Sequence, residues 1–198
     1  MGADEIAAQV VAFARRLQQI DPIFAEIALT GAQFDLDGFD SWMRQPLVWD
    51  LARDQWRELA PGPYPTTIYC WNRRLPDNGG CKFEIYVNDM RAGNGVTMND
   101  VPSEVNNPQA LTGILSALIE SFGAAQADVL SAWDMQLHPV WARHWRVWMR
   151  EGRSLPDDPD NRFKKEQGHY SSAEPWLGGT LYTWPEYEPW RYEGPARS

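Results

Sequence analysis

Residues 129–151 read VLSAWDMQLHPVWARHWRVWMRE and hold four of the 11 tryptophans of the chain. A buried tryptophan removes roughly 200 Å² from water, so we expect this segment to form a core or a contact surface rather than a linker. The apolar residues of 129–137 alternate as in a strand, and a proline ends that pattern. From 141 onward the spacing fits both a helix and a strand; we predict a helical turn at 139–143 and a strand at 145–151. The segment is therefore expected to be the scaffold on which the remaining elements pack.

The size and composition of the chain favour one globular domain. It has 198 residues, of which 43% are hydrophobic and 23% charged. We assign residues 1–198 to a single domain, with 152–198 as a loop and an aromatic tail lying on the body. Two cysteines fit a reducing compartment. No apolar run approaches the ~20 residues of a membrane span, and the first residues do not resemble a secretory signal, so we expect a cytoplasmic protein.

The net charge of −9 is unevenly distributed. Residues 1–60 hold ten acids and five bases, residues 61–150 hold eight and seven, and residues 151–198 hold nine and six. Nucleic-acid binding requires a basic surface, so this balance disfavours it and favours a basic protein partner. The sequence thus predicts a nearly neutral centre with acidic flanks.

The N-terminal part is predicted to begin with a helix that has Asp4 as its N-cap and ends before Pro22. Its apolar stripe comprises Ile6, Val10, Phe13 and Leu17. Alternating apolar residues predict a strand over 23–31. Tryptophans at every seventh position then predict a second amphipathic helix over 46–59.

A β-hairpin is predicted where TTIYCWNRR and CKFEIYVND flank the turn-forming sequence LPDNGG. With the turn centred near Asn78, Cys70 is expected opposite Tyr86 rather than Cys81, so the two thiols need not meet. A short third strand should follow at 96–98. The residues expected to share one face of the second strand are Cys81, Phe83, Ile85 and Val87.

The clearest helix covers residues 107–123, because Asn107-Pro108 can cap and open it and Gly123 can end it. Its apolar face comprises Leu111, Ile114, Leu115, Leu118, Ile119 and Phe122. A last strand is expected at 180–184. Together these elements predict an α+β fold, with a mostly antiparallel sheet of about five to six strands. The N-terminal helix should pack on the long core helix, and the aromatic-rich C-terminal tail should be extended.

The sequence shows no signature of catalysis or of metal and cofactor binding. The three histidines do not flank a glutamate at metal-binding spacing, and Cys-x-x-Cys and Gly-x-Ser-x-Gly are both missing. We therefore predict a protein that is not an enzyme and has no cofactor. The alternative is a small hydrolase or ligand-binding enzyme that uses Asp134, His138 and His144.

Recognition of another protein fits the remaining features better. Carboxylates can steer the encounter with a basic enzyme such as a nuclease, while aromatic residues anchor the contact. The predicted partner-binding residues are Asp35, Asp37, Asp40, Trp42, Asp50, Asp54, Glu186, Glu188 and Trp190. Two other interpretations stay open: the aromatic residues are all core and the charge serves solubility, or the chain is a subunit of a larger assembly.

Four segments, in their order along the chain, resemble immunity protein family 52 of bacterial polymorphic toxin systems. They are DPIFAEIALTG (21–31), FEIYVND (83–89), ADVLSAWDMQLHP (127–139) and HWRVWMREG (144–152). The first resembles the family's P-x-x-x-x-W-[FY]-x-x-G-like segment, with Ile27 in place of an aromatic residue. The last resembles its GWM strand but reads RVWM. The resemblance covers about residues 6–151.

This resemblance implies a cytoplasmic antitoxin encoded beside a restriction-endonuclease-like toxin, which a contact-dependent or type VI secretion apparatus delivers. The protein would bind the nuclease domain of that toxin. The resemblance carries over no catalytic residue and no interface residue by position, because the interfaces of such families vary with the toxin. It also leaves open whether the free protein forms a homodimer.

Overall fold

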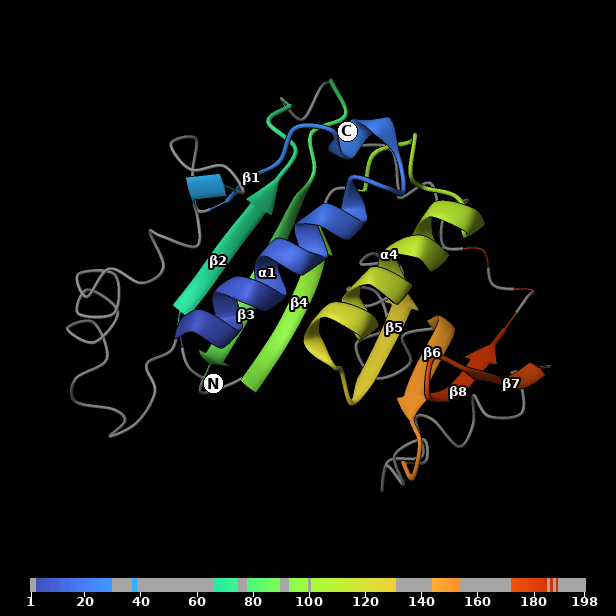
Figure 1. The fold of residues 1–198 in the computed structure, drawn as a ribbon. Helices are drawn as coiled ribbons and strands as arrows, with labels where there is room; N and C mark the ends of the chain where they lie inside the picture. Colours follow the sequence, from blue (N-terminus) through green and yellow to red (C-terminus); the bar gives the residue numbers. More distant parts are fainter. Residues whose placement is uncertain are drawn as a thin grey trace. The chain divides into compact units, whose positions relative to one another are not determined.

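The chain has an α+β fold (Figure 1), seen in a computed structural model. The structure describes residues 3–29, 37–38, 66–74, 78–89, 93–99, 101–130, 144–153, 172–184, 186 and 188. Backbone contacts divide the chain into two compact units, Met1–Asn106 (unit 1) and Asn107–Ser198 (unit 2). Among the described residues, each unit contains an α-helix of 15 residues and an antiparallel sheet of four strands. The predicted class is confirmed, but the single sheet of five to six strands is wrong because the strands form two sheets.

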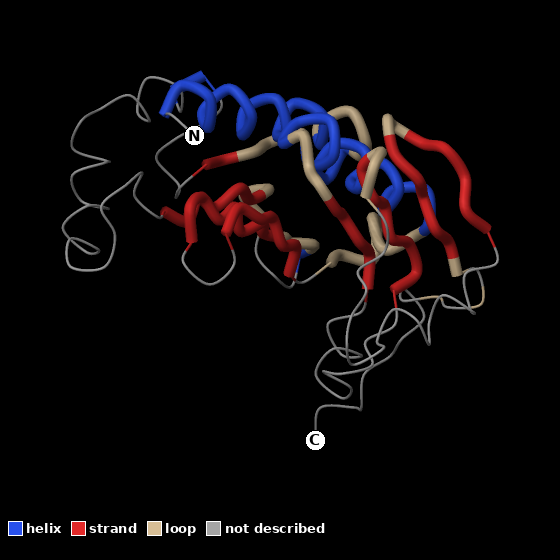
Figure 2. Tube along the Cα trace, turned by 90° about the horizontal axis from the view of Figure 1, so that it is seen from below, coloured by secondary structure: helices blue, strands red, loops and turns tan. Residues whose placement is uncertain are grey.

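In unit 1, the helix α1 covers one face of the sheet. The elements are α1 (Ala3–Leu17), the 3-10 helix η1 (Pro22–Phe24) and the strands β1 (Ala28–Leu29), β2 (Thr66–Trp71), β3 (Lys82–Asp89) and β4 (Gly93–Asn99). The strands are ordered β1-β2-β3-β4. Figure 2 shows α1 on one side of these strands. The predicted apolar stripe of α1 is buried, and Phe13 packs edge-on against Phe83 of β3, with ring centroids 5.2 Å apart.

Two predictions for the start of unit 1 are wrong. Asp4 lies inside α1 rather than before it, since the helix already begins at Ala3. Of the strand predicted over 23–31, the described residues 23–29 form a strand only at Ala28–Leu29, because η1 occupies the first positions. Pro22 presets a helical φ, and the Asp21 carboxylate accepts a hydrogen bond from the Ile23 N–H at 2.8 Å. These local interactions outweigh the alternating pattern.

The predicted hairpin is present as β2 and β3, but its register differs from the prediction. Cys70 pairs with Phe83 rather than Tyr86. The side chain of Asn72, which is buried, accepts from the Cys81 N–H at 3.0 Å and donates to the Gly79 carbonyl at 2.8 Å. This anchoring moves the centre of the turn toward the N-terminus. Strand β4 is also longer than predicted.

Unit 2 repeats the combination of one helix and four antiparallel strands. Its elements are α4 (Pro108–Phe122), β5 (Gln126–Leu130), β6 (His144–Arg150), β7 (Ser172–Trp176) and β8 (Gly179–Thr183), and its sheet order is β5-β6-β8-β7. The prediction of α4 is confirmed at both ends. Asn107 caps it by accepting from the Ala110 N–H at 3.0 Å, and Gly123 ends it with a left-handed φ of 54°.

The central strand β6 is buried on both of its faces. Trp148 packs with Leu115 and Ile119 of α4, whereas Val147 and Met149 are buried on the other face beside Tyr182. The bounds of β6 confirm the strand predicted over 145–151. Trp145 and Trp148 are core residues, as expected for a scaffold.

Several predicted elements differ or lie outside the described residues. The strand predicted to start near 129 begins earlier, at Gln126. Residues 172–183 form two strands of the sheet, where only one strand within a tail was expected. Three predicted features lie outside the described residues: the helix over 46–59, the turn over 139–143 and the part of the strand predicted over 131–137. The single-domain assignment stays a prediction, as does the packing of the N-terminal helix on the core helix. Among the residues that the structure describes, no helix is long and apolar enough to cross a membrane.

Candidate functional site

The described members of the predicted acidic surface are solvent-exposed or half-buried. Asp37 is 92% exposed and lies 3.6 Å from the guanidinium of Arg15, which is itself exposed. Glu186 is exposed and Glu188 is half-buried. The other predicted contact residues lie outside the described part: Asp35, Asp40, Trp42, Asp50, Asp54 and Trp190.

The alternative enzyme site falls mostly outside the described residues. This applies to Asp134 and His138, and to the side chain of His144, whose backbone begins β6. The structure therefore does not bring these three side chains together in its described part.

The face of the unit 1 sheet opposite α1 carries a network of polar and aromatic side chains. Lys82 lies with its Nζ 2.8 Å from Glu84 Oε1, and the Tyr86 hydroxyl donates to Glu84 Oε2 at 2.5 Å. The Lys82 ammonium also sits 4.9 Å from the ring centroid of Tyr69, which is 40% exposed. We call Tyr69, Lys82, Glu84 and Tyr86 the outer-face network.

A hydrogen bond and an ion pair, both to Glu84, hold the outer-face network together. The hydrogen bond to Glu84 raises the pKa of the Tyr86 hydroxyl, because ionisation would break it and place two negative charges together. Both carboxylate oxygens of Glu84 are already engaged. The network thus presents partly ordered aromatic and charged groups, which suit a protein interface.

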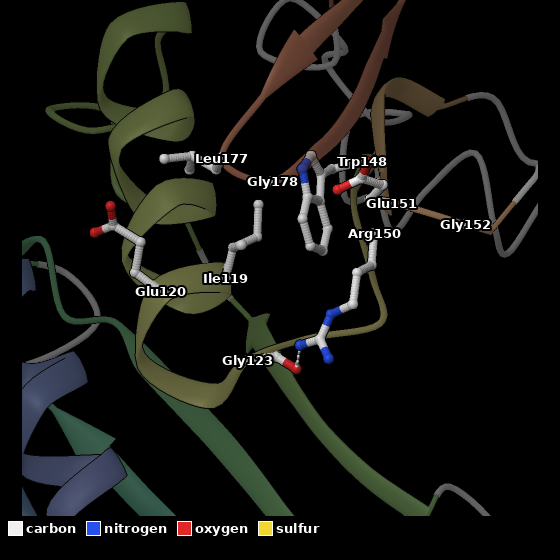
Figure 3. Close-up of a pocket in the computed structure, with 9 residues that line it drawn as sticks. All are labelled: Ile119, Glu120, Gly123, Trp148, Arg150, Glu151, Gly152, Leu177 and Gly178. Atoms are coloured by element: carbon white, nitrogen blue, oxygen red, sulfur yellow. Dashed lines mark hydrogen bonds between the residues drawn. The ribbon is translucent and has the colours of Figure 1, made fainter.

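A second candidate site is an open depression of about 760 Å³ in unit 2 (Figure 3). It lies between the C-terminal half of α4, strand β6 and the turn that joins β7 to β8. Its apolar lining comes from Ile119, Trp148 and Leu177. Figure 3 shows Ile119 directed from α4 toward the indole of Trp148. The indole is fixed, because its Nε1–H donates to the Trp176 carbonyl at 2.8 Å.

Charged residues surround this apolar lining. The guanidinium of Arg150 reaches along the depression and donates to the carbonyl of Gly123, which satisfies the C-terminal end of α4. Glu151 borders the depression on the β6 side, and Glu120 borders it from α4 with its carboxylate directed away from Trp148. The lining residues therefore carry two carboxylates and one guanidinium that is engaged with the backbone.

The turn beside the depression has an unusual residue at its tip. The register pairs Trp176 with Gly179, so Leu177 and Gly178 form a two-residue loop. Both have a positive φ, 47° for Leu177 and 70° for Gly178. A leucine rarely adopts this left-handed conformation, because its Cβ approaches the neighbouring carbonyl.

Arg146 is a half-buried charge that links β6 to α4. Its Nη1 donates to the Thr112 hydroxyl at 2.7 Å, and its guanidinium lies 4.4 Å from the ring centroid of Trp145. Burial lowers the pKa of this guanidinium, and the charge of Glu174 partly offsets that effect. These contacts indicate a role in holding the helix against the sheet.

The two cysteines are buried free thiols in unit 1. Burial raises the pKa of Cys81 to about 12, which Arg74 partly offsets, and burial also raises the pKa of Cys70, with the nearby Cys81 adding to it. Both thiols are therefore protonated at neutral pH and poorly nucleophilic. Among the residues that the structure describes, no three His, Cys, Asp or Glu side chains are grouped to hold a metal ion.

Sequence reasoning did not identify the depression or the outer-face network. The Gly-Gly pair at 178–179 is a turn signal that could have located the hairpin between β7 and β8. The outer-face network could have been read from the alternate residues of β3, once its neighbours in β2 were known. The arrangement around Arg150 has no local sequence signal, because it joins segments that are distant in the chain.

A functional proposal for this chain rests on the acidic surface, the outer-face network and the depression in unit 2. No protein-family model matches the chain, and no curated protein matches it significantly.

Proposed function

We propose that the chain is an immunity protein that binds and neutralises a cognate secreted nuclease toxin and so protects the producing cell and its kin. The partner would be the basic nuclease domain of a toxin from a polymorphic toxin or type VI secretion system. In this proposal the protein acts in the cytoplasm, without a cofactor and without catalysis. It occludes the toxin by a contact in which carboxylates meet basic side chains.

The exposed acids of the two flanks carry the proposal. Asp37 and Glu186 are exposed, and the chain as a whole carries a net charge of −9. The ion pair of Asp37 with Arg15 is long and exposed, so it neutralises little of this charge. A surface of this sign accelerates association with a positively charged nuclease, whose own surface must attract phosphates.

Several described residues of the segments that resemble immunity protein family 52 are buried, which supports the same proposal. Ile27 follows η1 and is buried, and Trp145 and Trp148 are buried in β6. The buried residues of these segments would maintain the scaffold, while the outward-facing residues would vary with the toxin. The outer-face network and the acidic flanks are then the regions that determine partner choice.

Co-expression with the nuclease domain encoded beside this chain tests the proposal directly. We expect the chain to allow growth of cells that express the toxin and to co-purify with the toxin as a stable complex. If cells die and no complex forms, the proposal is wrong.

The electrostatic part of the proposal is tested by association kinetics. The double variant Asp37→Lys with Glu186→Lys should slow association with the toxin by roughly tenfold at low ionic strength and much less at high salt. The matched control reverses two exposed acids outside the predicted surface, Glu5→Lys with Glu26→Lys. Both double variants change the net charge equally, so equal slowing would show that net charge acts and that the predicted positions do not.

A further inference from the structure

Leu177 occupies a backbone position that favours other residues. It is the first residue of a two-residue loop in which both residues have positive φ. Hairpin loops of this kind prefer Asn-Gly, because asparagine tolerates the left-handed region and leucine does not. The chain instead has Leu-Gly, so its turn carries strain that one substitution would relieve.

Leu177 is also 36% exposed, and it is one of three large hydrophobic residues that are exposed in the described part of the chain. The strain and the exposure both oppose leucine at this position in the free protein. A strained residue that the fold does not require points to a function, and exposure at a loop tip points to a contact.

The depression next to Leu177 indicates the chemistry of that contact. Leu177 offers exposed apolar surface above the buried Ile119 and Trp148, while the exposed carboxylate of Glu151 lies at the rim. The guanidinium of Arg150 is directed to the Gly123 carbonyl. An exposed leucine in a depression with a carboxylate at its rim matches a long cationic side chain, whose methylene stem packs on the leucine while its charged end meets the acid.

We infer that the depression receives a lysine or arginine side chain of the toxin, with Leu177 as the apolar anchor and Glu151 as the partner of the cation. This inference rests on the proposed function and adds a specific contact to it. The negative charge of the whole chain and the basic character expected of a nuclease provide the charge complementarity.

The test compares three variants in binding to the nuclease domain encoded beside this chain. Leu177→Asn should raise the Kd about tenfold, as for a contact at the centre of an interface, while the melting temperature of the free protein stays the same or rises. Glu151→Gln should raise the Kd by about threefold at low salt and by less at high salt. The matched control is Val101→Asn, which removes an apolar side chain that is 37% exposed in unit 1 and should leave the Kd unchanged.

The outcomes separate this inference from the proposed function. If the unmodified protein does not bind the toxin, the proposed function fails and the inference falls with it. If it binds and Leu177→Asn binds equally well, only the inference is overturned. A lower melting temperature for Leu177→Asn would assign the leucine a structural role and would overturn it too. An unchanged Kd for Glu151→Gln would show that the occupant is not a cation.

Discussion

Units 1 and 2 combine the same elements but bury their sheets differently. In β3 of unit 1, Phe83 and Ile85 are buried, whereas Lys82 is exposed and Glu84 is half-buried on the opposite face. In β6 of unit 2, adjacent residues point to opposite faces and both are buried, with Val147 at 0% and Trp148 at 1% exposure. The central strand of unit 1 is thus amphipathic, whereas that of unit 2 is buried on both faces at Val147 and Trp148.

This difference determines where each unit can contact a partner. Unit 1 presents polar and aromatic side chains on the face of its sheet, which makes the outer-face network available for recognition. The centre of the unit 2 sheet is buried on both faces, so contacts must come from its rims and turns. The exposed leucine at the tip of the β7–β8 turn fits that restriction.

The largest expected effect comes from placing asparagine on a buried face of the unit 2 sheet, compared with the exposed face of the unit 1 sheet. Val147→Asn should destabilise unit 2 by roughly 3 to 5 kcal/mol, since it removes buried apolar area and leaves an amide without a partner. Thr97→Asn in β4, on the exposed face of the unit 1 sheet, should change the free energy of unfolding by less than about 1 kcal/mol. Urea unfolding, with hydrogen exchange to localise the effect, measures both.

Similar losses for the two variants would contradict the proposed difference between the sheets. A small loss for Val147→Asn would mean that the second face of β6 accepts a polar group, and that face would then become a candidate contact surface.

The glycines of the two sheets provide a contrast of opposite sign. A Cβ at Gly179 would lie 2.7 Å from the indole of Trp148 and would collide with the Met149 carbonyl, whereas a Cβ at Gly95 would meet only Tyr86, at 4.0 Å. Gly179→Ala should therefore cost about 2 kcal/mol. Gly95→Ala should stabilise unit 1 by roughly 0.5 kcal/mol, because alanine loses less backbone entropy on folding.

Thermal unfolding of the two alanine variants tests this contrast. If both variants have lower melting temperatures than the unmodified protein, the strand around Gly95 is as tightly packed as that around Gly179. The two sheets would then differ less in packing than their burial indicates.

The same difference between the sheets explains which elements the sequence could predict. The sequence predicts β3 and α4 correctly, because each of these two elements buries one face and so has a periodic apolar pattern. The capping residues of α4 also mark its two ends. For β6 the periodicity did not distinguish helix from strand, because Trp141, Trp145 and Trp148 also have helical spacing. Trp148 is buried on the face opposite Val147, so burial on both faces of the strand produces this ambiguity. Strand β7 was missed because it is an exposed edge strand that contains Pro175.

The register of the hairpin and the candidate sites required the structure. The hydrogen bonds of Asn72 to Gly79 and Cys81 set the loop between β2 and β3, and turn-forming residues alone do not specify such contacts. The depression in unit 2 combines residues from α4, β6 and the β7–β8 turn, so no local pattern reveals it. The acidic flanks, in contrast, were visible from the charge distribution alone.

The smallest expected effect concerns pH, and it should be confined to unit 1, which contains both cysteines of the chain. In the unfolded chain a thiol ionises near pH 8.5, whereas burial keeps Cys81 protonated up to about pH 12. The unfolded state therefore binds fewer protons above pH 8.5, so the free energy of unfolding should fall as pH rises from there toward 12. Between pH 7.5 and 8.5 the two thiols together should make the loss roughly 0.7 kcal/mol greater than in a Cys70→Ala, Cys81→Ala variant. Urea unfolding at both pH values measures it, and equal losses would mean that the folded protein lets its thiols ionise as freely as the unfolded chain does.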